Sequence, residues 1–120
     1  MQAVVELPGF AAALRDAGLS EREAQRIVDR IAVAPTAGDL IPGTGGARKV
    51  RFAGRGKGKS GGYRVITFYS GPKVPVFLIT LFTKGEKVDL TQAERNAMKR
   101  ELAGLVEDYR RGAMRHVRSR

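Results

Sequence analysis

The fold is decided by the stretch YRVITFYSGPKVPVFLITLFT, residues 63–83. Residues 63–70 are rich in aromatic and β-branched side chains, which favour a strand. A Ser-Gly-Pro-Lys turn follows at residues 70–73. Residues 74–83 are apolar at nearly every position, which is typical of a central strand, with Pro75 tolerated only near its start. The stretch therefore predicts two antiparallel strands joined by a short turn.

The residues before this stretch predict a third strand. Over residues 48–52, Val50 and Phe52 alternate with Lys49 and Arg51, which indicates a half-buried strand with a basic outer face. Residues 38–46 and 54–62 are rich in glycine and are expected to be loops. Because sequential strands with short connections usually pair, the three strands predict an antiparallel meander.

Helices are predicted both before and after these strands along the sequence. A short strand within residues 1–7 precedes a helix that begins at Pro8 and ends at Gly18. Ser20 caps a second helix that Pro35 terminates, and Thr91 with Glu94 forms a capping box for a last helix. We therefore expect an α+β domain over residues 1–111: an N-terminal strand, a helical hairpin, an antiparallel β-meander and a C-terminal helix. Residues 112–120 are expected to be a basic tail.

Charge is unevenly distributed along the 120 residues, whose formal net charge is +10. Residues 40–85 carry nine basic side chains and no acidic one, whereas residues 1–39 have a net charge of −2. Such segregation attracts a polyanion, most commonly a nucleic-acid backbone. The absence of cysteine and of a signal-peptide pattern predicts a cytoplasmic protein, and no apolar run is long enough to cross a membrane.

Several motifs in the sequence also have simpler structural interpretations. Gly58-Lys59-Ser60 resembles the end of a phosphate-binding P-loop, but Ala53 replaces the first glycine and a strand follows instead of a helix. A basic loop that clamps a nucleic-acid backbone is favoured over a merely solvated hairpin. Arg64 either binds a phosphate or covers the end of the sheet, and spacing does not decide between the two. His116 lies in the tail, and no residues have metal-ligand spacing, so no metal or cofactor is expected.

Three segments together carry a family resemblance: residues 46–51 (GARKVR), 58–66 (GKSGGYRVI) and 82–91 (FTKGEKVDLT). They resemble the HigB branch of the RelE/ParE toxin superfamily, whose order of elements is also similar. The resemblance implies the toxin of a bacterial type II toxin–antitoxin system, which cuts mRNA on the ribosome by attack of the substrate's own 2′-hydroxyl, without a metal. It also implies a cognate antitoxin, typically a helix-turn-helix protein of the HigA type.

The resemblance assigns catalytic roles by position to Lys59, Arg64 and Lys84. The clustered cations around them are the candidate RNA-binding residues: Arg48, Lys49, Arg51, Arg55, Lys57 and Lys87. Relatives often have tyrosine where Phe82 stands and near Leu90 or Thr91, so no tyrosine is given a role and the general acid and base stay open. Two alternatives remain, a ParE-like inhibitor of DNA gyrase and a nucleic-acid-binding module without nuclease activity.

Overall fold

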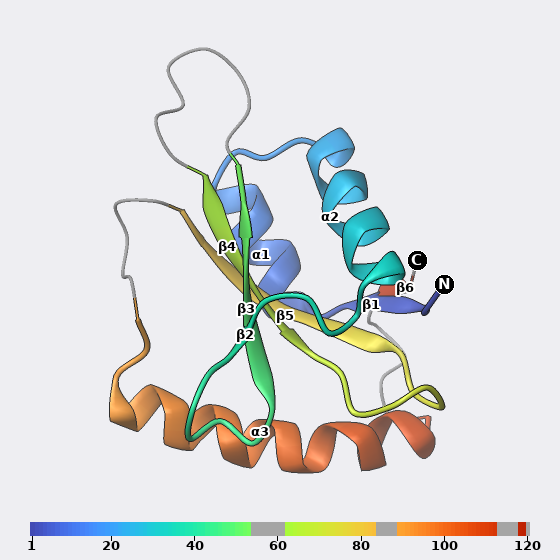
Figure 1. Cartoon of the computed structure of the whole chain (residues 1–120), viewed down its shortest axis with the longest axis vertical. Helices are drawn as coiled ribbons and strands as arrows, with labels where there is room; N and C mark the ends of the chain where they lie inside the picture. The colour runs from blue at the N-terminus through green and yellow to red at the C-terminus, as the bar shows by residue number, and fades with distance from the viewer. Residues whose placement is uncertain (54–61, 84–88, 113–117, 120) are drawn as a thin grey trace.

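A computed structural model describes residues 1–53, 62–83, 89–112 and 118–119. The chain runs through β1 (Val4–Glu6), α1 (Pro8–Asp16), α2 (Glu21–Val33), β2 (Asp39–Leu40), β3 (Ala47–Phe52), β4 (Tyr63–Phe68), β5 (Val76–Thr83), α3 (Gln92–Arg110) and β6 (Arg118–Ser119). Figure 1 shows the helical hairpin of α1 and α2 on one side of the sheet and α3 on the other. The expected α+β class is confirmed.

The helix ends follow the signals in the sequence. Pro8 is the first residue of α1, and Gly18, with φ of 69°, lies just past its end in the left-handed region. The Ser20 side chain accepts a hydrogen bond from the Glu23 amide at the start of α2. At α3 both halves of the Thr91–Glu94 capping box form, which fixes where the chain turns into that helix.

Within the described residues the sheet has six strands, in the order β2-β3-β4-β5-β1-β6. The expected meander of β3, β4 and β5 is antiparallel, and β5 lies centrally. The N-terminal β1 inserts beside β5 in parallel, with Val4 opposite Val76, so the sheet is mixed. Two very short strands complete its edges. β2 pairs with β3 within a region expected to be a loop, and β6, within the expected tail, pairs with β1.

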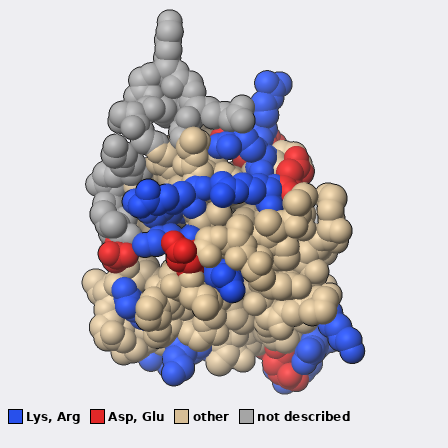
Figure 2. Space-filling view, viewed as in Figure 1, with Lys and Arg blue, Asp and Glu red and all other residues tan. Residues whose placement is uncertain are grey.

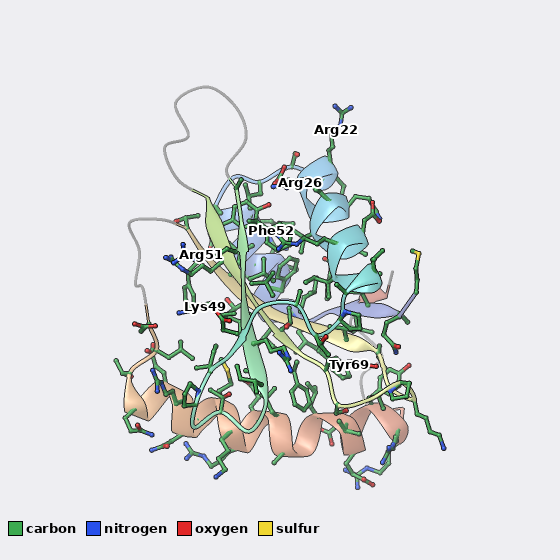
Figure 3. All side chains as sticks on the ribbon, viewed as in Figure 1. Arg22, Arg26, Lys49, Arg51, Phe52 and Tyr69 are labelled. Carbon is green, nitrogen blue, oxygen red and sulfur yellow. The ribbon has the colours of Figure 1, made fainter. Side chains whose placement is uncertain are left out.

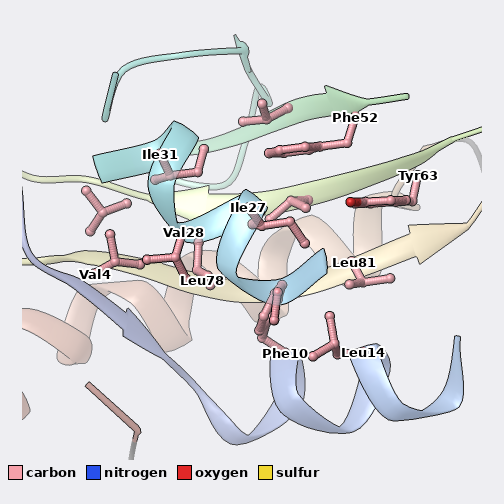
Figure 4. Packing of buried hydrophobic residues seen from close by; sticks show 14 of the residues in the cluster. Val4, Phe10, Leu14, Ile27, Val28, Ile31, Phe52, Tyr63, Leu78 and Leu81 are labelled. Carbon is pink, nitrogen blue, oxygen red and sulfur yellow. The ribbon is translucent and has the colours of Figure 1, made fainter. Parts of the chain in front are cut away.

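The first core fills the space between the sheet and the helical hairpin. Phe10 and Leu14 of α1 pack with Ile27 and Ile31 of α2 against the sheet (Figure 4). Alternation along each strand supplies the sheet side of this core, with Val50 and Phe52 from β3 and Tyr63, Val65, Leu78 and Leu81 from β4 and β5. Phe10 and Ile27 have no exposed surface, so the hairpin is fixed firmly to the sheet.

The second core lies on the opposite face, under α3. Met98, Leu102 and Leu105 of α3 pack against a set of sheet residues that includes Ile66, Phe68, Phe77 and Ile79. The β4–β5 register shifts between Ile66 and Thr67, so that β5 has one extra residue at this point. On the α3 face, cationic side chains lie where β3 ends and β4 begins, near the start of α3. No helix in the described ranges is long and apolar enough to cross a membrane.

Candidate functional site

A row of side chains crosses three strands near that end of the sheet. Arg51 of β3 is the cross-strand partner of Arg64 of β4, which is in turn opposite Phe82 of β5. Directly paired residues share a face, and Ile66, the next residue but one from Arg64, packs in the core under α3. Lys49, the next residue but one from Arg51, is therefore on this face as well. The fold thus gathers three cations on one face of β3 and β4.

This arrangement of cations lowers the stability of the fold. Like charges directly opposite one another on neighbouring strands are destabilising, and Arg51 and Arg64 occupy such a pair. The Nε atom of Arg64 is also buried and has no hydrogen-bond partner within the described part of the chain. A buried, unpartnered donor of a charged group is costly, and an anion with several acceptor oxygens would satisfy it. Arg64 is therefore the candidate anion-binding residue of this row.

One carboxylate reaches this cationic face from the start of α3. Asp89 accepts a hydrogen bond from Lys49, with 3.0 Å between Oδ1 and Nζ. That hydrogen bond and the charge of Lys49 lower the pKa of Asp89, and the charges of Arg95 and Arg64 lower it further. Asp89 is therefore ionised at neutral pH. Its side chain is 65% exposed, so a ligand from solvent can replace it.

Arg95, in the first turn of α3, adds a fourth cation to the site. Its Nη1 lies 3.4 Å from the Pro42 carbonyl, and its aliphatic part packs beside Gly43. Like Arg64, it has a buried Nε without a partner among the described residues. Gly43 has φ of 82°, so a glycine allows the chain to turn next to this side chain. Lys49, Arg64 and Arg95 thus come from three elements, and all three lower the pKa of Asp89.

Two arginines of α2 hold the end of β3 from the other side. Arg30 Nη1 donates to the Arg51 carbonyl at 2.6 Å, and Arg26 Nη2 donates to the Ala53 carbonyl at 2.9 Å. Both guanidinium groups lie over the Phe52 ring, at 4.7 Å and 5.5 Å from its centre for Arg30 and Arg26. These contacts fix the backbone on which Arg51 stands.

Arg26 also belongs to a small polar cluster behind this strand end. It pairs with Glu23, which accepts a hydrogen bond from the Tyr63 hydroxyl. The Tyr63 ring stacks on Phe52, with 5.5 Å between ring centres. Burial raises the pKa of Tyr63, and the hydrogen bond to Glu23 raises it further. Arg26 thus contacts both Ala53, just after β3, and Tyr63, at the start of β4.

The structure brings only some of the predicted site residues together. Arg64, Lys49 and Arg51 share one face, as described. Arg48 points to the opposite face, where its Nη1 lies 3.1 Å from the Thr36 carbonyl, and it is not part of this group. Five predicted residues lie outside the described residues: Arg55, Lys57, Lys59, Lys84 and Lys87.

Four residues of the site were not predicted from the sequence: Asp89, Arg95, Arg26 and Arg30. Their roles depend on the packing of α2 and α3 against the sheet. The spacing of Arg26 and Arg30, four residues apart on one side of α2, was the one available signal. Among the described residues, no three His, Cys, Asp or Glu side chains come together in a way that would hold a metal ion.

Comparison with known protein families gives a match that covers nearly the whole chain. Residues 6–119 match the family model described as the RelE toxin of the RelE/RelB toxin–antitoxin system. The match begins at the last residue of β1, extends to the end of β6 and includes every site residue named above.

Proposed function

Because the chain belongs to the RelE toxin family of toxin–antitoxin systems, we propose that it is a ribosome-dependent mRNA endonuclease that inhibits translation. The observation that carries this proposal is Arg64. Arg64 is the cross-strand partner of Arg51, and its buried Nε has no hydrogen-bond partner in the described part of the chain. A phosphodiester of RNA presents the oxygens that these donors lack.

The proposed reaction requires charge stabilisation more than any other contribution. The 2′-hydroxyl loses its proton as its oxygen bonds to phosphorus. The bond from phosphorus to the 5′-oxygen breaks and that oxygen takes up a proton, so a cyclic phosphate and a free 5′-hydroxyl result. Negative charge increases on the phosphate oxygens in the transition state, where fixed cations are most effective. Arg64 is proposed to supply that charge together with Lys84. Lys59 is proposed to position the RNA or assist proton transfer.

The need for a ribosome follows from what the site offers. Among the described residues the site presents cations and the single carboxylate of Asp89, whose lowered pKa makes it a weak base. A site of this kind gains most when another body aligns the 2′-hydroxyl with the phosphorus, since alignment supplies several kcal/mol of the barrier. We propose that the ribosome, with message in place, provides this alignment.

The test compares Arg64→Ala with the control Arg100→Ala, which removes an exposed cation of α3. Each purified protein is incubated with message alone and with message on programmed ribosomes, in the presence of a chelator. Loss of one preorganised charge is expected to slow cutting about 10²–10³-fold for Arg64→Ala, with no comparable change for the control. Equal cutting by both variants would remove Arg64 from the site, and equal cutting of naked message would remove the ribosome requirement.

A different outcome would favour the gyrase alternative. If induced expression leaves transcripts intact and triggers a DNA damage response, the chain is a ParE-like inhibitor and the nuclease proposal fails. If neither cutting nor DNA damage occurs while RNA binding persists, the chain is a binding module.

The family also implies a cognate antitoxin. We further propose that this chain is of the HigB-like branch and that its antitoxin is a helix-turn-helix protein of the HigA type, since the GKSGGYRVI run at residues 58–66 resembles that branch. Both proteins are expected in the cytoplasm. Co-expression with the product of the neighbouring gene should restore growth and give a co-purifying complex, whereas recovery of free, toxic protein would refute this pairing.

A further inference from the structure

The outer side of α2 carries a line of arginines. Arg22, Arg26 and Arg30 are four residues apart, which places them on one side of a helix. The side facing the sheet is apolar, with Ile27 and Ile31 buried in the first core. The arginine line borders this apolar face, and Arg26 and Arg30 also hold the end of β3 through the carbonyls of Ala53 and Arg51.

This line meets the cations of β3 at the edge of the sheet, because Arg26 and Arg30 lie on the Phe52 face of the strand and Lys49 and Arg51 on its other face. The hydrogen bonds of Arg26 and Arg30 to the carbonyls of Ala53 and Arg51 bring the end of β3 against α2. Figure 3 shows Arg22 and Arg26 on α2, with Lys49 and Arg51 across the strand end. In the space-filling view, basic side chains form a continuous stripe over this face (Figure 2). We call it the basic band: Arg22, Arg26, Arg30, Lys49 and Arg51.

The band retains excess positive charge after its internal pairs are counted. Glu23 pairs with Arg26, and Asp89 pairs with Lys49. In the described ranges Arg22, Arg30 and Arg51 are in no ion pair with a carboxylate. These three cations are available to an external anion, and they span both elements of the band.

The composition of the band favours a nucleic acid over a protein. Protein interfaces have an apolar centre depleted of charge, but the large hydrophobic side chains exposed in the described chain are Met1, Val33, Leu40 and Tyr109, none of them in the band. Arginine also binds phosphate with two parallel hydrogen bonds, which suits a backbone of repeated phosphates.

We propose that the basic band binds the same RNA strand that the site cleaves, in the stretch next to the scissile bond. This inference rests on the proposed function. Arg51 belongs both to the band and to the row that contains Arg64. On this proposal a strand with one phosphate at Arg64 passes Arg51 and crosses the edge of the sheet at the end of β3, where β2 does not reach, and Arg30 and Arg22 hold phosphates farther along the strand.

The test measures binding of non-cleavable single-stranded RNA of two lengths, about four and about twelve nucleotides, which bracket the usual footprint of small single-strand binders. The variant is Arg22→Ala with Arg30→Gln. The control is Arg100→Ala with Arg110→Ala, which removes two exposed cations from α3 and gives the same change in net charge. Arg22→Ala alone is included because Arg22 has no described contact that could disturb the fold.

The band variant should bind the long RNA more weakly, and its log–log salt slope should fall by about 1.4, or 0.7 for each lost phosphate contact. Arg22→Ala alone should show about half of this effect on the long RNA, and it should leave binding of the short RNA unchanged because Arg22 is not a residue of the site. The control should match the parent for both lengths.

Three results would overturn the proposal. Equal weakening for both lengths would mean that the site itself was disturbed. Unchanged oligonucleotide binding with weaker ribosome binding would assign the band to ribosomal RNA. Weaker binding of the antitoxin alone would assign the band to the antitoxin. Because the RNA cannot be cut, the band can be confirmed even if the proposed nuclease activity fails.

Discussion

Replacing Asp89 by asparagine should strengthen RNA binding, although it alters a residue of the site. In the free protein Asp89 pairs with Lys49 at 3.0 Å and is also within the field of Arg64 and Arg95. Phosphate must displace or tolerate this carboxylate when it binds. Asparagine has nearly the same shape but no charge, so Lys49 becomes available to the RNA.

The size of the effect follows from counterion release. One additional phosphate contact by single-stranded RNA steepens the log–log salt slope by about 0.7. Between 50 and 200 mM salt, a fourfold range, the advantage of Asp89→Asn over the parent should therefore shrink about 2.5-fold. The measurement is a fluorescence-anisotropy titration of non-cleavable RNA at several salt concentrations.

The matched control is Asp108→Asn. Asp108 is also exposed and pairs with Arg111 at 3.1 Å, but it lies at the far end of α3. It changes the net charge equally and should leave the slope as in the parent. If Asp89→Asn binds RNA more weakly, or leaves the slope unchanged, then Asp89 holds Lys49 in place for the substrate and does not compete with it.

Two further predictions concern stability. Because Tyr63 has a raised pKa in the folded state, only the unfolded chain loses the tyrosine proton just above about pH 10, so the free energy of unfolding should fall as the pH rises there. Tyr63→Phe should make that fall shallower, as measured by urea titrations at several pH values. An identical pH dependence in the variant and the parent would refute the assignment. Gly38→Ala should lower the melting temperature, since φ is 87° and the new Cβ would lie 2.4 Å from the Lys49 carbonyl oxygen. Gly71→Ala, with φ of 137° and open space around it, is the control for backbone strain alone. Equal decreases in melting temperature for the two variants would exclude the clash.

Local patterns in the sequence were sufficient to predict most elements. The alternation of Val50 and Phe52 with Lys49 and Arg51 predicted both the strand and its buried face, because a strand repeats every two residues. Ser20 and Thr91 predicted the starts of α2 and α3, since capping depends on neighbours within three residues. Such features are decided by short-range physics.

Features that depend on tertiary contact were missed for the same reason. β2 and β6 have two residues each, too few for any periodicity, and they exist only because an edge strand lies beside them. The site was predicted in part. Lys49 was identified by charge clustering, and Arg64 by its strand position and the family resemblance. Asp89 is forty residues from Lys49, and the net negative charge of residues 1–39 concealed the arginines on one side of α2.

The parallel pairing of β1 with β5 also has a consequence for synthesis of the protein. Val4 is made early, whereas its partner Val76 follows 72 residues later. At translation speeds of about 5–20 residues per second, that interval is roughly 4–14 seconds. During this time Arg51 and Arg64 are on strands that still lack a complete sheet, and α3, which brings Asp89 and Arg95, is made later still. A prematurely terminated chain should therefore be harmless, and toxicity should begin only when a nearly complete molecule has left the ribosome that made it.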